Sequence, residues 1–313
     1  MTNLSEFTFL SSDGKTQLHG MLWEPEGVAV RAVLQICHGV AEHIARYDGF
    51  ARALNEQGIV VAGHDHLGHG KSLPEGGTPV YFGDGNTWNT VVDDIYVLHQ
   101  RLKQRYPDVP LCIMGHSMGS FLTRTYLIRY PGTVKAAVIM GTGWQPRAAI
   151  TGGLALANAI AAVSGENATS ELVTELAFGS YNKLFAPNRT KVDWLSADES
   201  NVDDYIADPL CGADATVGLF RQMLHGIRFN QRQSHLRQMD KQMPVLFVAG
   251  DKDPVGSCGK GVRQTYDAFR AAGMRDCTLK LYPDLRHEIL NEKAYAADIT
   301  KDIEAWLLSR LEK

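Results

Sequence analysis

The sequence predicts an α/β fold in which helices cover both faces of a mostly parallel sheet and a helical cap is inserted into the chain. Three observations predict it. Short apolar runs alternate with amphipathic helical patterns along most of the 313 residues, as expected for buried parallel strands joined by helices. The alternation stops between Gly141 and about Asn230 and then resumes. Apolar residues make up 44% of the chain and charged residues 21%, the composition of an ordinary globular protein.

The first part of the chain reads as strands and helices in turn. Two β-type runs, Glu6–Leu10 and Gln17–Trp23, are joined by the polar turn Ser11–Gly14. Helical spacing of apolar residues then predicts helices over Ile44–Gln57, over Thr87–Arg105 and up to Arg129. The continuous apolar runs between these helices predict strands at Arg31–Cys37, Gly58–Ala62, Leu111–Met114 and Lys135–Met140.

The middle of the chain lacks a strong strand pattern. It holds Ala- and Gly-rich segments, then polar segments, then a helical pattern near Thr216–Phe229. The strand and helix alternation resumes with Pro244–Ala249, Gly259–Ala272, Thr278–Tyr282 and a terminal helix over about Asn291–Leu311. We therefore expect a core formed by residues 1–143 and 231–313, with a helical cap at residues 144–230.

Charge and cysteine content argue against several classes of protein. The net charge is −4 and the basic residues are scattered, so a nucleic-acid-binding surface is not expected. Five cysteines without CxxC pairing indicate free thiols in a reducing compartment. The N-terminus lacks the basic and apolar regions of a signal peptide, and no apolar run reaches about 18 residues. We expect a cytoplasmic protein.

The most informative motif is Gly115-His116-Ser117-Met118-Gly119. It follows an apolar strand and precedes a helical pattern, which is the context of a nucleophile elbow. The two glycines leave room for a strained serine at a sharp turn. The helix N-terminus favours the negative charge that develops when the serine attacks. Ser117 is therefore the predicted nucleophile.

A serine hydroxyl needs a base, and the base needs an orienting acid. With this elbow the chain order is Ser, then Asp or Glu, then His. His287 follows the last predicted strand and is the only histidine after His235. Asp251 and Asp253 both follow Pro244–Ala249. We favour Asp253, which lies deeper in the loop and precedes a proline that would hold the turn.

The negative oxygen formed during attack on a carbonyl needs two fixed N–H donors. One is expected from Met118, directly after the nucleophile, and the other from the loop after the third strand. Gly39 in that loop lets the backbone approach closely, so the N–H of Val40 is the second predicted donor.

Five short motifs resemble the monoacylglycerol lipase and lysophospholipase branch of the α/β-hydrolases. They are His38–His43, Asp65–Ser72, Gly115–Gly119, Gly250–Asp253 and Arg286-His287. The resemblance implies an α/β-hydrolase fold with an eight-stranded sheet. It also implies a serine carboxylic-ester hydrolase that acts on single-chain acyl esters, such as monoacylglycerols or lysophospholipids, with no cofactor. Glu42 and Arg46 would line the polar end of the pocket, and His116 is assigned to the same substrate-binding set.

The small apolar segment Gly152–Val163 has two interpretations. The simpler one is a packed cap helix. The other is that its apolar face lines an acyl tunnel or makes transient contact with a lipid surface.

Other functions remain open. A short-chain carboxylesterase, a peptidase or a catalytically silent binding protein could share this fold. His64, His66 and His69 have the spacing of some metallohydrolases, but Gly68 stands where such sites usually carry a carboxylate, so no metal is expected. Gly70-Lys71-Ser72 looks like the end of a P-loop, yet Asp65 replaces the required glycine. Cys258 is expected to be a packed thiol. The oligomeric state is left open.

Overall fold

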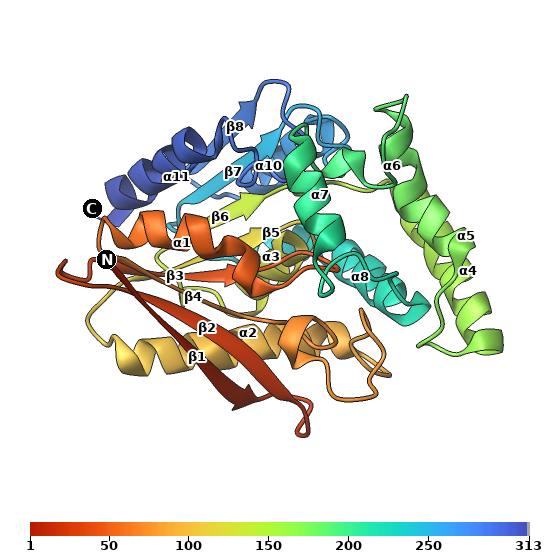
Figure 1. Ribbon diagram of the computed structural model, residues 1–313, viewed down its shortest axis with the longest axis horizontal. Coiled ribbons are helices and arrows are strands. Elements are labelled where there is room, and N and C mark those ends of the chain that lie inside the picture. The colour runs from red at the N-terminus through yellow and green to blue at the C-terminus, as the bar shows by residue number, and fades with distance from the viewer. Residues whose placement is uncertain (312–313) are drawn as a thin grey trace.

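The computed structural model describes residues 1–311 and is built around one eight-stranded sheet. The strand order is β1-β2-β4-β3-β5-β6-β7-β8 (Figure 1). β1 pairs with β2, and β2 with β4, in antiparallel register, whereas all pairs from β4 to β8 are parallel. The strands are β1 (Thr2–Leu10), β2 (Gln17–Pro25), β3 (Ala32–Cys37), β4 (Ile59–His64), β5 (Leu111–His116), β6 (Ala136–Met140), β7 (Val245–Gly250) and β8 (Cys277–Tyr282).

The centre of the sheet is buried on both faces. Every residue of β3, β4, β5, β6 and β7 is buried. Their continuous apolar sequences follow from this, because a strand covered on both faces has no solvent side to alternate with. The edge strand β1 is mostly exposed. The predicted α/β-hydrolase fold class is confirmed.

Helices cover the two faces of the sheet. On one face lie α1 (Asp48–Asn55) and α11 (Ala296–Leu311), whose apolar residues pack against β3, β4, β6 and β7. On the other face lie α2 (Thr87–Arg105), α3 (Met118–Arg129) and α10 (Lys260–Ala271). Two separate hydrophobic clusters, one on each side of the sheet, form the core of the molecule.

Two helices are shorter than their sequence patterns predict. The helix expected over Ile44–Gln57 begins with a 3₁₀ turn at Ile44–Tyr47, where the Ile44 N–H donates to the Asp65 carboxylate at 2.8 Å. The terminal helix begins at Ala296 and not near Asn291. The Glu292 carboxylate accepts N–H bonds from Ala197 at 2.8 Å and Asp198 at 3.2 Å, so this segment fastens the region between β6 and β7.

One isolated β-bridge joins Thr169 to Thr216 between β6 and β7, and the regular elements there are all helices or helical turns. They are α4 (Arg147–Ser164), α5 (Glu171–Thr174), the π-helical turn Glu175–Gly179, α6 (Ser180–Lys183), the 3₁₀ turn Asp193–Leu195, α7 (Glu199–Ala207), α8 (Val217–Asn230) and α9 (Gln233–Leu236). Figure 1 shows α4 to α8 gathered at one end of the sheet. We call the elements from α4 to α8 the cap.

Helix α4 is the most apolar helix of the cap. Among residues 1–311 it alone is long and apolar enough to cross a membrane by length and composition, with a mean hydropathy of 1.3 and 17% of its residues buried. Such a helix is weak evidence for a membrane span. The predicted segment Gly152–Val163 lies inside it.

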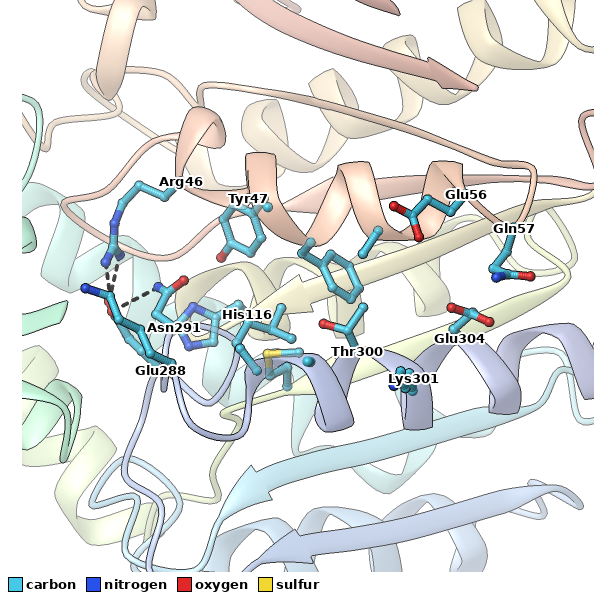
Figure 2. Close-up of a pocket in the computed structure, with 18 of the residues that line it drawn as sticks. Arg46, Tyr47, Glu56, Gln57, His116, Glu288, Asn291, Thr300, Lys301 and Glu304 are labelled. Carbon is cyan, nitrogen blue, oxygen red and sulfur yellow. Dashed lines mark hydrogen bonds and ion pairs between the residues drawn. The ribbon is translucent and has the colours of Figure 1, made fainter. Parts of the chain in front are cut away.

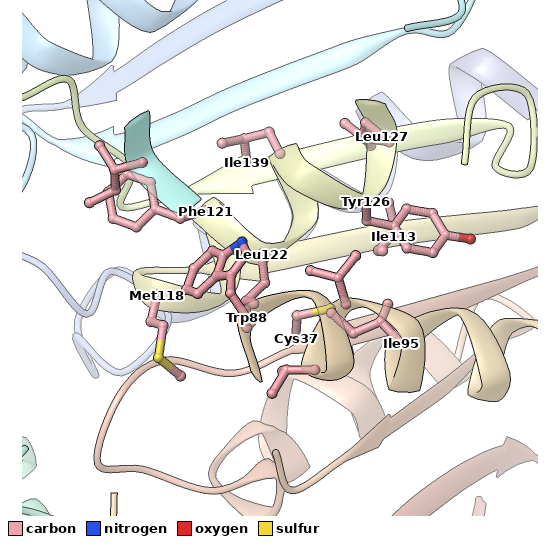
Figure 3. Packing of buried hydrophobic residues seen from close by; sticks show 14 of the residues in the cluster. Cys37, Trp88, Ile95, Ile113, Met118, Phe121, Leu122, Tyr126, Leu127 and Ile139 are labelled. Carbon is pink, nitrogen blue, oxygen red and sulfur yellow. The ribbon is translucent and has the colours of Figure 1, made fainter. Parts of the chain in front are cut away.

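Helix α8 fastens the cap to the core. The Trp88 indole of α2 donates to Thr125 Oγ1 at 3.0 Å, and Thr125 in turn donates to Asn230 Oδ1 at 2.8 Å. A Cβ on Gly226 would lie 2.1 Å from the Trp88 ring, so α8 packs against α2 without any intervening side chain. Figure 3 shows Trp88 among Met118, Phe121 and Leu122 in the buried cluster beside β5.

Candidate active site

The predicted nucleophile lies at a strained turn between β5 and α3. Ser117 has φ 53° and ψ −121°, a conformation that L-residues rarely adopt. A Cβ on Gly115 would lie 2.2 Å from the Gly119 carbonyl oxygen, and one on Gly119 would lie 2.0 Å from the Cys37 carbonyl oxygen. Any larger residue at these two positions would clash with backbone. The two glycines of the motif are therefore dictated by packing around the turn.

Asp253 and His287 lie in the loops that follow β7 and β8, and their side chains are in contact. His287 Nδ1–H donates to Asp253 Oδ1 at 2.9 Å, although the two residues follow different strands. Both are buried, with exposures of 2% and 0%. The same carboxylate oxygen accepts the Val255 N–H at 2.9 Å. The Asp253 carboxylate thus fixes the tautomer and the orientation of the imidazole.

The competing aspartate has another partner. Asp251 Oδ1 accepts the N–H of Asp284 at 2.8 Å and closes the turn after β8. Asp251 is half-exposed, and among residues 1–311 its carboxylate forms no hydrogen bond with His287. Of the two aspartates, the structure brings Asp253 to the histidine.

The other ring nitrogen of His287 is available. His287 Nε2 is buried and has no hydrogen-bond partner in the described part of the chain. The ring of His287 lies 4.7 Å from that of His116, the neighbour of Ser117, and 5.1 Å from that of Trp194, measured between centroids. Trp194 and Ser117 line the same cavity. The imidazole is therefore held beside this cavity with a free acceptor nitrogen.

The two residues predicted to supply the N–H donors also line this cavity. Val40 and Met118 line it together with Ser117. Gly39 lies directly against the serine, because a Cβ added to it would be 3.1 Å from Ser117 Cβ. The Gly39 N–H donates to Glu42 Oε1 at 2.5 Å, which fixes the loop. Met118 is the first residue of α3, so its N–H is among those with no intrahelical acceptor.

The cavity at Ser117 is mainly apolar. Its volume is about 380 Å³, within the range of roughly 300–1,000 Å³ typical of small-molecule sites. Core residues such as Phe121 form part of its lining. Its other walls come from the cap and include Ile150, Leu156, Val173, Phe178, Tyr181, Trp194, Phe220, Met223, Leu224 and Ile227. The cap therefore supplies most of the surface that would contact an acyl chain.

Glu42, Arg46 and His116 line a second cavity instead. It has a volume of about 800 Å³ and extends between α1 and α11, as Figure 2 shows. Arg46 forms a double ion pair with Glu288 at 2.7 and 2.8 Å and donates to Glu42 at 3.0 Å. These contacts occupy the groups predicted to bind substrate. Their role as substrate contacts stays a prediction.

The charges of this network stabilise one another. Burial raises the pKa of Glu42, but the bonds and charges of His116 and Arg46 lower it well below its usual value. Burial likewise opposes protonation of His116, yet the Glu42 carboxylate raises the pKa of this histidine. His116 Nδ1 contacts Glu42 Oε1 at 3.2 Å and Nε2 contacts the His287 carbonyl at 3.3 Å. Because both partners are acceptors, the geometry fits a protonated ring.

Two residues of the site escape prediction from the sequence. Glu288 forms an ion pair with Arg46. Its position directly after His287 is the one feature of the sequence that could have indicated a place in the site. Trp194 comes from a short turn in the cap, and no pattern in the sequence distinguishes it.

The histidines with metallohydrolase spacing are not arranged as ligands. Among residues 1–311, one group of at least three His, Cys, Asp or Glu residues has ligand atoms within 4.8 Å of one another, and it contains none of His64, His66 and His69. Burial lowers the pKa of His64 and of His69 to about 3, so these rings are neutral. His38 joins its loop to the next one, because its Nε2 accepts the His66 N–H at 2.9 Å.

Comparison with known proteins gives one family and several relatives. The family described as Serine aminopeptidase, S33 matches residues 28–294. The chain is 31% identical to a monoacylglycerol lipase of Mycolicibacterium smegmatis over 98% of both chains. It is 27% identical to the monoglyceride lipase of Mus musculus, over 96% of this chain and 90% of the relative. A carboxyl esterase from Bacillus coagulans, solved in complex with glycerol, superposes with a TM-score of 0.92 at 26% identity, over 99% of this chain and 100% of that one.

Proposed function

Because the chain belongs to the serine aminopeptidase S33 family of α/β-hydrolases and is a serine ester hydrolase, we propose that its substrates are monoacylglycerols. The observation that carries this proposal is the apolar cavity that Ser117 lines together with many residues of the cap. A cavity of about 380 Å³ suits one acyl chain, and relatives over nearly the whole chain are monoacylglycerol lipases.

The proposed mechanism is acyl transfer to water. Ser117 Oγ attacks the ester carbonyl while His287 Nε2 takes its proton. The tetrahedral intermediate then expels the alcohol, which receives that proton from His287, and an acyl-enzyme remains on Ser117. Water, deprotonated by the same nitrogen, attacks the acyl-enzyme and releases the fatty acid. Asp253 stabilises the imidazolium in both halves of the reaction.

The negative charge formed in each tetrahedral intermediate needs fixed donors. We assign this role to the N–H groups of Val40 and Met118, two residues that line the same cavity as Ser117. The positive end of the α3 dipole acts in the same direction. The bond from Gly39 to Glu42 holds the Val40 loop in place before substrate arrives.

The cap is the part of the molecule proposed to meet a lipid surface. Three of its exposed apolar side chains are Val163, Leu172 and Leu184, with exposures of 88%, 55% and 60%. They lie between α4 and the residue that follows α6, in the part of the cap that also walls the cavity, and Ile206 and Leu210 are further exposed apolar residues in and after α7. Contact through these side chains would place the cavity close to single-chain esters in a membrane or micelle.

A substrate panel tests the proposal. Wild-type protein and Ser117→Ala are assayed on monoacylglycerols, lysophospholipids, short p-nitrophenyl esters and aminoacyl-p-nitroanilides. We expect the highest kcat/KM on monoacylglycerols and a loss of about 10⁶-fold in kcat in the variant, the scale seen for removal of a catalytic serine. A preference for short esters would favour a carboxylesterase, and turnover of the anilides would favour a peptidase.

A further inference from the structure

A second cluster of reactive side chains lies outside the proposed active site. His43 Nε2 is 2.8 Å from Asp208 Oδ2, and one ligand atom from each of His43, Asp208 and Cys211 lies within 4.8 Å of the other two. Among residues 1–311 this is the one group of His, Cys, Asp or Glu so arranged. The proposed reaction uses none of the three.

These donors suit one class of ligand. Imidazole nitrogen, carboxylate oxygen and thiolate sulfur are the groups that bind Zn²⁺, at about 2.0–2.3 Å. In a tetrahedral site such ligands lie roughly 3.3–3.8 Å apart, so the present spacing needs adjustments on the order of 1 Å. We propose that His43, Asp208 and Cys211 form a Zn²⁺ site that joins the loop after β3 to the cap, with water as the fourth ligand.

The backbone holds the ligands in position. The Cys211 N–H donates to the Asp208 carbonyl at 3.0 Å, so both residues belong to one tight turn after α7. The Leu210 N–H donates to Asp208 Oδ1 at 2.9 Å, which orients the carboxylate and leaves Oδ2 on the side of His43. Little chain entropy is therefore lost when the metal binds.

The same turn is fastened to the loop that carries His43. The Gly212 N–H and the Tyr205 hydroxyl both donate to the Ala41 carbonyl, each at 3.0 Å. Ala41 lies two residues before His43 and next to Val40. A bound ion would thus link the cap directly to the loop proposed to stabilise the oxyanion.

The charges around the cluster permit a cation. The nearby Arg46 guanidinium is paired with Glu42 and Glu288, which offsets its repulsion. The Asp208 carboxylate and the Cys211 thiolate balance the two charges of the ion, and the thiol proton leaves to solvent on binding. His43 is buried, whereas Asp208 and Cys211 are partly exposed, so the ion has a route from solvent.

Metal titration of the 313-residue protein tests the site without any ester assay. Co²⁺, which replaces Zn²⁺ in such sites, should bind with a stoichiometry of one and give a thiolate-to-metal absorption band in the near ultraviolet. Zn²⁺ should displace it. At a Zn²⁺ concentration about 100-fold above the dissociation constant, the midpoint of thermal unfolding should rise by about 4 °C.

Substitutions of the proposed ligands and of a control cysteine show whether Co²⁺ binds at this site or elsewhere. Cys211→Ser should abolish the Co²⁺ band, and Asp208→Asn should weaken binding by more than the roughly 10–100-fold that loss of an outer-shell partner costs. Cys277→Ser removes another partly exposed thiol and should keep the band. Absence of stoichiometric binding to the wild-type protein, or a band that survives Cys211→Ser, would overturn the proposal. Because no readout depends on ester turnover, failure here leaves the proposed function untouched.

Discussion

At the scale of single residues, two aspartates in one loop have different tasks. Asp253 is fully buried and accepts the His287 Nδ1–H, whereas Asp251 accepts a backbone N–H in a turn. Only Asp253 contacts the imidazole. The same conservative substitution at each position should therefore affect ester turnover differently.

Asp253→Asn should lower kcat by about 10⁴-fold, because an amide favours the wrong imidazole tautomer and cannot stabilise the imidazolium. Asp251→Asn is the matched control and should keep ester turnover within a few-fold of wild type, since the amide oxygen can still accept the Asp284 N–H. Steady-state kinetics on one ester compares the two variants. Equal losses in both would contradict the assignment of Asp253.

Much of the proposed triad could be assigned from the sequence, and the reason is local. The elbow is defined by steric demands within five neighbouring residues, and His287 follows the last strand with no competing histidine. The Arg46–Glu288 contact could not be predicted in the same way. It joins positions 242 residues apart, and neither residue carries a local pattern that reveals its partner.

At the scale of elements, a buried carboxylate ties the first hairpin to α2. Asp94 of α2 accepts the Ser11 hydroxyl at 2.9 Å and the Ser12 N–H at 2.5 Å. Burial nevertheless raises the pKa of Asp94 from 3.8 to about 6. The folded protein therefore binds this proton more tightly than the unfolded chain does.

The consequence for stability has a definite sign. A carboxyl whose pKa is raised on folding stabilises the protein below its unfolded pKa and loses that contribution as the pH rises through its folded pKa. A rise from 3.8 to about 6 corresponds to about 3 kcal/mol at 1.36 kcal/mol per unit. Asp94→Asn should remove this part of the pH dependence and raise stability at pH 7. Urea unfolding of the wild type and of Asp94→Asn at several pH values measures the two free energies of unfolding. The same pH dependence in both proteins would contradict the raised pKa of Asp94.

The contact between α8 and α2 leaves no room for a methyl group. Gly226→Ala should lower the free energy of unfolding by about 1–3 kcal/mol, because the new Cβ would overlap the Trp88 ring. Gly152→Ala is the control: Gly152 lies in α4 with nothing within 4 Å of its added Cβ, so the change should be neutral or stabilise by up to about 1 kcal/mol. Denaturant titration compares them. A stable Gly226→Ala protein would show that the helices separate easily.

The boundaries of elements were harder to predict than their presence. The apolar period of Ile44–Gln57 indicated one helix, but Asp65 from a distant loop binds the Ile44 N–H and the first turn becomes 3₁₀. The start of α11 is displaced by the contacts of Glu292 with the cap. In both cases a tertiary hydrogen bond overrides the local pattern.

At the scale of the whole molecule, the core supplies the proposed chemistry and the cap supplies the proposed specificity. Ser117, Asp253 and His287 follow strands of the sheet, whereas most of the cavity wall comes from cap residues. The sequence predicted the cap as a helical insertion, yet it could not predict which cap side chains face the cavity. That depends on how α4 lies across α8.

One residue of α4 tests this division. Leu156 lines the cavity, whereas its neighbour Ala155 is exposed and lies outside the lining. Leu156→Asp should reduce kcat/KM on long-chain esters by about 10-fold or more relative to acetate esters, since a charge in the apolar wall opposes burial of the chain. Ala155→Asp should leave the ratio unchanged. Equal losses on long and short esters with Leu156→Asp would count against an acyl wall at α4.

Covalent labelling with a fluorophosphonate, followed by mass spectrometry of the digested protein, tests most directly whether Ser117 is the nucleophile. We expect a single adduct on the peptide that contains Ser117, formed as Ser117 Oγ displaces fluoride. Labelling should be lost in Ser117→Ala and slowed strongly in His287→Ala. An unlabelled Ser117 in a protein that still hydrolyses esters, or an adduct that persists in Ser117→Ala, would contradict it.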